Sequence, residues 1–139
     1  MTENEAGTVI LDAAFTVFGE LGSSLLESVY EAALAHELRH RGLFVVRQAV
    51  IPVRYRGIEL EEGFRADLVV EKKVLVELKS VERLLPVHGK QVLTYLRLSG
   101  LSLGYLINFG SPVLKDGIQR IVNKFQLSKF FSAFFAFSA

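Results

Sequence analysis

The sequence predicts an α/β (α+β) fold, a single domain in which a central sheet is flanked by helices. The first observation is the length of 139 residues, half of them hydrophobic, which suits one compact core and is too short for two domains. The second is the spacing of apolar residues, which is helical up to Gly42 and then changes to short β-rich runs. A sheet covered by helices is the layered arrangement that this order favours.

Eight elements are predicted, in the order α-α-β-β-β-α-β-α. The clearest helix signal is Leu26, Tyr30, Leu34 and Leu38 at helical spacing, with Gly42 just past the expected helix end. The predicted helices cover residues 9–21, 24–41, 86–98 and 116–125. The predicted strands cover residues 44–55, 58–70, 74–81 and 103–109, and the first three are expected to pair as consecutive antiparallel strands.

The domain is expected to comprise residues 1–125, followed by a Phe-rich C-terminal tail at 126–139. The tail is interpreted either as a short packed helix or as an exposed apolar segment. It falls short of the roughly 20 apolar residues that cross a bilayer, so no membrane partner is expected.

Composition excludes several classes of site. The formal charge of +1 means that any nucleic acid must be held by a local cluster of Lys and Arg. The absence of cysteine excludes disulfides, thiol catalysis and thiolate metal sites, and suits a reducing compartment. The polar, acidic start of the chain lacks the features of a signal peptide, so a cytoplasmic location is expected.

The segment 64–80 carries the main functional signal, because it consists of two apolar strands joined by a polar turn. If the turn is residues 71–73, Asp67 lies opposite Glu77, and Lys79 shares the face of Glu77 because side chains alternate along a strand. Like charges at this separation destabilise a sheet. A divalent cation such as Mg²⁺ would offset them and would activate water for attack on a phosphodiester.

The same residues also fit an exposed strand face without a metal. Asp67 would then pair with Arg65 or Lys79, as charged residues on antiparallel strands often do. The register depends on the turn, since a two-residue turn would send Asp67 to the face opposite Glu77. Spacing alone leaves both interpretations open.

Two motif patterns resemble known families. Asp67 followed by Glu77-Leu78-Lys79 resembles the D-(x)n-E-x-K signature of the PD-(D/E)xK nucleases, with Ala66 where a proline often stands. From about Ile10 to Val122 the chain also resembles the GxxExxY family within that superfamily. This resemblance is carried by LLESVY at 25–30, RADL at 65–68, VELK at 76–79, QVLTYL at 91–96 and LINF at 106–109. Two positions depart from it, since the motif glycine is Ser24 and a His of the first helix is Phe18.

The resemblance implies a restriction-endonuclease-like core with a mixed central sheet, and a nuclease that uses Mg²⁺ or Mn²⁺. It implies metal ligands from the carboxylates of Asp67, Glu77 and Glu27 and from the backbone carbonyl of Leu78. The implied catalytic residues are Lys79, Glu77, Asp67 and Gln91, with Gln91 holding the attacking water or contacting a phosphate.

Two of these residues have ordinary structural roles as alternatives. Ser24 and Glu27 fit the S-x-x-E pattern of a capping box, a role that does not exclude metal binding. Gln91 would share a plain helix surface with His88 and Tyr95. Nearby basic residues are candidate phosphate contacts, although such side chains are more often only solvated: Lys72, Lys73, Arg83, Lys90 and Arg97.

The sequence therefore predicts hydrolysis of nucleic acid by a metal-activated water, with DNA expected in preference to RNA. The alternative is a catalytically inactive module of the same fold that binds nucleic acid or protein. A homodimer is a further expectation, because dimerisation gives domains of this size a second nucleic-acid contact.

Overall fold

The computed structural model of the protein describes residues 1–124, so the predicted tail at 126–139 lies outside the described residues. Its helices are α1 (Glu3–Leu21), α2 (Glu27–His40) and α3 (Pro86–Ser99), with a 3-10 turn, η1 (Leu114–Gly117). Its strands are β1 (Val45–Tyr55), β2 (Ile58–Val70), β3 (Val74–Lys79), β4 (Leu103–Asn108) and β5 (Ile118–Val122). Within residues 1–124 no helix is both long and apolar enough to span a bilayer.

The five strands form one mixed sheet in the order β1-β2-β3-β4-β5. Neighbouring strands are antiparallel except for β3 and β4, which run parallel and are joined by the α3 crossover. This arrangement confirms the predicted α/β (α+β) class, a mixed central sheet flanked by helices, and is consistent with a restriction-endonuclease-like fold.

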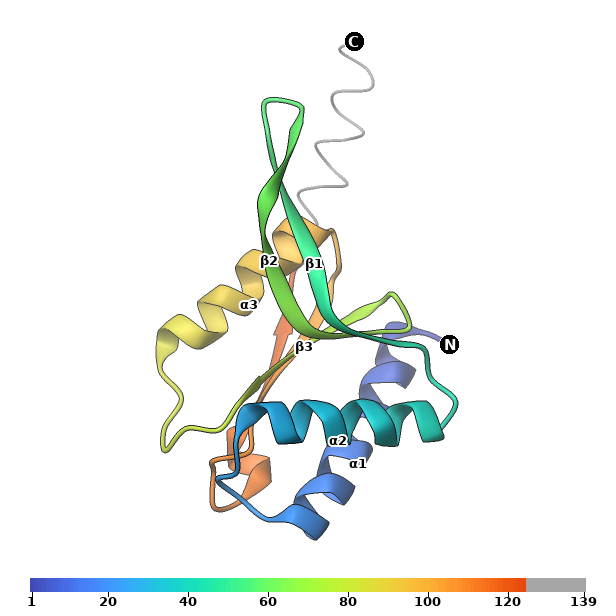
Figure 1. The fold of residues 1–139 in the computed structure, drawn as a ribbon, viewed down its shortest axis with the longest axis vertical. Coiled ribbons are helices and arrows are strands. Elements are labelled where there is room, and N and C mark those ends of the chain that lie inside the picture. Colours follow the sequence, from blue (N-terminus) through green and yellow to red (C-terminus); the bar gives the residue numbers. More distant parts are fainter. Residues whose placement is uncertain (125–139) are drawn as a thin grey trace.

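The helices cover the two faces of the sheet, with α1 and α2 on one face and α3 on the other (Figure 1). Alternation along β3 divides the core between these layers. Val76 and Leu78 pack with α1 and α2, whereas Leu75 packs with Val92 and Leu96 of α3. The charged residues of β3 therefore emerge from a strand that is apolar on both sides.

The beginnings of the first two helices differ from the predicted ones. The helix α1 begins at Glu3 rather than at Val9, because Thr2 and Glu5 form a capping box. The helix α2 begins at Glu27, its N-cap is Leu26, and no side chain caps it, so the predicted start at Ser24 and the Ser24–Glu27 capping box are wrong. Ser24 has a left-handed backbone (φ 70), which cannot belong to a right-handed helix.

The last predicted helix, 116–125, is also wrong, and the region forms η1 and β5 instead. Ile118 packs against the α1/α2 core while Ile121 packs against the α3 core, as residues three apart on a strand do. Helical spacing and strand spacing cannot be separated in so short an apolar run. Antiparallel pairing with β4, from Leu103↔Val122 to Ile107↔Ile118, decides in favour of the strand.

The hairpin of β1 and β2 extends past the end of α3 (Figure 1). Its register shifts between Ile51 and Val53, which marks a bulge. Gly63 lies at this bulge, and a Cβ there would meet the Ile51 carbonyl oxygen at 2.4 Å, so the close approach of the two strands requires glycine.

Candidate active site

The hairpin of β2 and β3 has the predicted three-residue turn at 71–73. Val70 pairs with Val74, and the Lys73 N–H donates to the Val70 carbonyl at 3.0 Å. Glu71 and Lys72 adopt left-handed backbones (φ 54 and 56) that close the turn. The ladder continues from this turn end to the Leu68↔Val76 pair, and Asp67 and Glu77 follow it at the open end of the hairpin.

Asp67 and Glu77 link the two strands through their side chains at the open end. The Asp67 N–H donates to Glu77 Oε1 at 2.9 Å, and the Leu78 N–H donates to Asp67 Oδ2 at 2.8 Å. Each carboxylate thus accepts a hydrogen bond from the backbone of the opposite strand. The structure brings these two sequence-predicted residues into direct contact.

Both carboxylates lie where negative charge is disfavoured. Glu77 is 7% exposed, and burial together with the charge of Asp67 raises its pKa to about 8, against the opposing effect of Lys79. Burial raises the pKa of Asp67 as well, and the nearby Glu31 adds to this, while the Leu78 N–H lowers it. A buried acid beside a half-buried one, both with raised pKa values, is a site where a cation would be stabilising.

An open cleft of about 620 Å³ lies beside Asp67. Its other walls are the loop before α2, the first turns of α2 and the residues Gln48 and Ser80. Glu27 is exposed and lines this cleft. Its charge raises the pKa of both Asp67 and Glu77, so the helix acid faces the strand acids.

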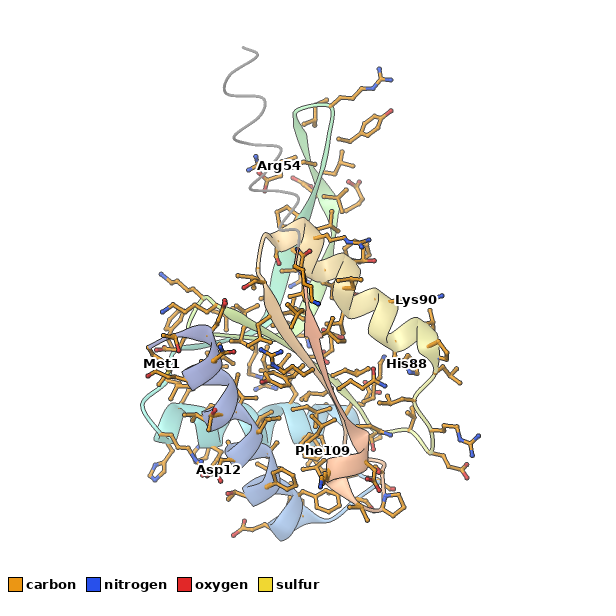
Figure 2. The ribbon with its side chains drawn as sticks, turned by 180° about the vertical axis from the view of Figure 1, so that it is seen from behind. Met1, Asp12, Arg54, His88, Lys90 and Phe109 are labelled. Atoms are coloured by element: carbon orange, nitrogen blue, oxygen red, sulfur yellow. The ribbon has the colours of Figure 1, made fainter. Side chains whose placement is uncertain are left out.

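Tyr30 holds the loop that carries Glu27. Its hydroxyl donates to the Gly22 carbonyl at 2.6 Å and accepts from the Leu25 N–H at 3.1 Å. Its ring stacks on Phe109 at 4.2 Å between centroids, and Phe109 lies near the end of the molecule opposite Arg54 (Figure 2). The helical spacing of apolar residues predicted that Tyr30 is buried. It could not predict that the Tyr30 hydroxyl forms hydrogen bonds with the preceding loop.

Lys79 and Gln91 lie on β3 and α3, respectively. Lys79 is half-buried at the end of β3, and its charge acts on Glu77. Gln91 is exposed on α3, close to the Tyr95 hydroxyl, and the pKa of Tyr95 is raised by burial and by Glu77 and Asp67. In the part of the chain that the structure describes, no hydrogen bond joins Lys79 or Gln91 to the carboxylates.

Sequence reasoning missed a polar network on the α2 side of Asp67. Gln48 of β1 donates to Asp67 Oδ1 at 3.2 Å and also to Glu31 Oε1. Arg47 donates to Glu31 Oε2 at 3.0 Å. Glu31 is buried, and one signal for it was its place one helical turn after Glu27.

Comparison with known families identifies the chain. The family model described as the PD-(D/E)XK nuclease superfamily matches residues 4–121, which is most of the sequence. The chain belongs to the PD-(D/E)XK nuclease superfamily. Searches among curated proteins and among solved structures found no match.

Nucleases of the PD-(D/E)XK superfamily act on phosphodiester bonds and generally use a divalent metal, typically Mg²⁺. The donors here are carboxylate and carbonyl oxygens, the ligand type that hard cations prefer. Among residues 1–124 no three His, Asp or Glu side chains are arranged as a complete metal-holding group. Glu77 Oε1 and Asp67 Oδ2 face backbone donors, whereas Glu77 Oε2 accepts no hydrogen bond from the described residues. The oxygen donors of Asp67 and Glu77, with the Glu27 carboxylate in the adjoining cleft, fit such a metal in chemical type.

Proposed function

We propose that this protein is a divalent-metal-dependent nuclease that hydrolyses phosphodiester bonds in nucleic acid, with DNA as the expected substrate. The observation that carries the proposal is the contact between Asp67 and Glu77 at the open end of the hairpin, with Lys79 two residues further along β3. The finer assignment to the GxxExxY proteins is part of the proposal. It is supported by the role of Tyr30 in holding the loop before Glu27.

Each site residue has a distinct role in the proposed reaction. Asp67, Glu77, Glu27 and the Leu78 carbonyl would hold Mg²⁺ or Mn²⁺. A bound divalent ion lowers the pKa of water and neutralises charge on a phosphate. The Lys79 ammonium stabilises the negative charge that develops on the phosphate oxygens, and the Gln91 amide orients the attacking water.

A groove on the α3 side of the β1–β2 hairpin supports nucleic acid as the substrate. The groove encloses about 1110 Å³, and most of its lining residues are apolar. Its charged lining residues within the described chain are all basic, although the whole chain carries a net charge of only +1: Arg54, Arg56, Lys72 and Arg97. Local clustering of this kind is what a phosphate backbone requires from a near-neutral protein.

The test is a nuclease assay on labelled single-stranded DNA, duplex DNA and RNA, with Mg²⁺, Mn²⁺ or EDTA. Glu77→Ala and Lys79→Ala should each lower the rate at least about a hundredfold, as removal of an electrostatic stabiliser typically does. Glu61→Ala and Lys115→Ala are matched controls at exposed positions and should leave the rate unchanged.

Full activity in both site variants would reject the proposal. Metal-independent nucleic-acid binding without turnover in any metal would instead support the inactive binding module.

A further inference from the structure

We infer that Gln48 is a positioning residue, which orients the Asp67 carboxylate for metal binding. This inference rests on the proposed function, because it takes Asp67 to be a metal ligand. It concerns a residue of β1, a strand that contributes none of the proposed ligands or catalytic residues.

The first observation is how completely the Asp67 carboxylate is held. Gln48 Nε2 donates to Oδ1 at 3.2 Å, and the Leu78 N–H donates to Oδ2 at 2.8 Å. Each oxygen thus has one donor, and the donors come from the strands on either side of β2. A carboxylate held at both oxygens has a fixed orientation and keeps lone pairs for a cation.

The second observation is that Gln48 is itself held in place. Its amide also donates to Glu31 Oε1, so it bridges two carboxylates. Glu31 is 7% exposed, and its other oxygen accepts from Arg47 Nε and contacts Arg47 Nη2, each at 3.0 Å. The Glu31 carboxylate thus fixes the Gln48 amide beside α2. Through Gln48, the orientation of the Asp67 carboxylate depends on the position of α2.

The third observation is the backbone of Gln48, which is left-handed (φ 50) in the middle of β1. Consecutive side chains on a strand normally point to opposite faces, yet Arg47 and Gln48 both contact Glu31. The ladder has pairs at Arg47↔Leu68 and Ala49↔Ala66 but none between Gln48 and Asp67. This left-handed backbone is unfavourable and leaves Gln48 without a partner in the ladder, so it does not stabilise the sheet. Such conformations cluster at functional sites.

The test compares Gln48→Gly with Arg56→Gly in the full chain. Both residues lie in the β1–β2 hairpin region with nearly equal left-handed backbones (φ 50 and 49), which glycine adopts without strain. Arg56 stacks on Tyr55 and forms no hydrogen bond or ion pair with Asp67 or Glu77 in the described part of the chain, so it is the matched control for metal binding and folding. Because Arg56 lines the basic groove, this variant is left out of the nuclease assay, in which Glu61→Ala is the control. Gln48→Met is a second variant, which keeps the length of the side chain but lacks the donor.

The primary measurement is Mn²⁺ binding by calorimetry or electron paramagnetic resonance, with thermal unfolding in EDTA as the check on folding. Loss of a hydrogen bond to a metal ligand typically weakens metal binding tenfold to a hundredfold. We expect that loss in Gln48→Gly and Gln48→Met, and less than a twofold change in Arg56→Gly. In the nuclease assay the required Mn²⁺ concentration should rise by the same factor, while KM for DNA stays constant.

Two failures are distinguishable with Asp67→Ala. If Asp67→Ala abolishes Mn²⁺ binding while both Gln48 variants bind Mn²⁺ as tightly as the wild type, the positioning role is overturned and the proposed function stands. If the wild type binds no Mn²⁺, or if Asp67→Ala binds it equally well, the metal site and the inference that depends on it are both overturned.

Discussion

The two ends of the β2–β3 hairpin are built from the same strands but differ in what holds them together. At the turn end, Val70, Val74 and Leu75 are fully buried, and the backbone ladder is regular. At the open end, beyond the Leu68–Val76 pair, the carboxylates of Asp67 and Glu77 bridge the two strands. The difference indicates that stability is concentrated at the turn end, while the open end maintains buried charge at a cost to stability.

The largest expected effect is the destabilisation caused by a substitution at the turn end. Leu75→Ala should lower the free energy of unfolding by about 2–5 kcal/mol, because it removes a fully buried side chain from the α3 core. At the open end, Glu77→Gln keeps the size of the side chain but removes a buried charge. The free energy of unfolding of this variant in EDTA at pH 8 should therefore equal or exceed that of the wild type. Urea unfolding measures both. Equal destabilisation by the two variants would contradict the proposed division between the ends.

The second prediction concerns pH and the open end alone. The pKa of Glu77 is raised to about 8 in the folded protein from an ordinary value of 4.5, so the folded state binds the proton more tightly. Its contribution to stability is therefore fully present below about pH 4.5 and is lost as pH rises to about 8, by the order of 1 kcal/mol per pH unit within that window.

Thermal unfolding in EDTA across this pH range, with Glu77→Gln as the matched variant, measures the effect. The variant should lack this component, and saturating Mn²⁺ should restore wild-type stability near pH 8. If the free energy of unfolding changes between pH 5 and pH 8 by the same amount in the wild type and in Glu77→Gln, Glu77 is not the responsible group.

The contrast between the ends also shows what the sequence could predict. Apolar strands around a polar segment indicated a turn at 71–73, and the register was predicted on the condition that this turn has three residues, which the structure confirms. Counting outward from that turn then placed Asp67 across from Glu77, and the two are in contact. These features depend on local pattern alone.

The features that were missed depend on tertiary contacts. The orientation of Gln48 arises from a left-handed backbone inside a strand, which no residue type at that position signals. The position of its partner Glu31 one helical turn after Glu27 was a signal, but that spacing does not show that Glu31 is buried against Gln48 and Arg47. The strand β5 was mistaken for a helix because only its pairing with β4 separates the two periodicities.

A third prediction concerns the basic groove, which reaches the turn end through Lys72 and includes neither Asp67 nor Glu77. The double variant Arg54→Ser/Arg97→Ser should weaken DNA binding and should reduce the slope of log affinity against log salt by about 2, one for each lost phosphate contact. Lys115→Ser/Arg120→Ser removes the same charge from the η1–β5 region and should leave the slope unchanged. Fluorescence anisotropy in EDTA measures binding without turnover, and equal slopes for the two double variants would exclude the groove as the path of the nucleic acid.

The smallest expected effect sharpens the description of the loop that carries Glu27. Ser24 stands where the GxxExxY pattern that the chain resembles has a glycine, and its backbone is left-handed (φ 70), a conformation that disfavours any residue with a Cβ. Ser24→Gly should therefore raise the free energy of unfolding by up to about 1 kcal/mol, because the Ser24 N–H bond to the Phe109 carbonyl, 3.0 Å long, needs no side chain. The neighbouring Ser23→Gly, whose backbone is not left-handed, should instead lower it, because glycine only adds freedom to the unfolded chain. Urea unfolding of the two variants compares them directly, and destabilisation by both would mean that the Ser24 side chain supports the loop.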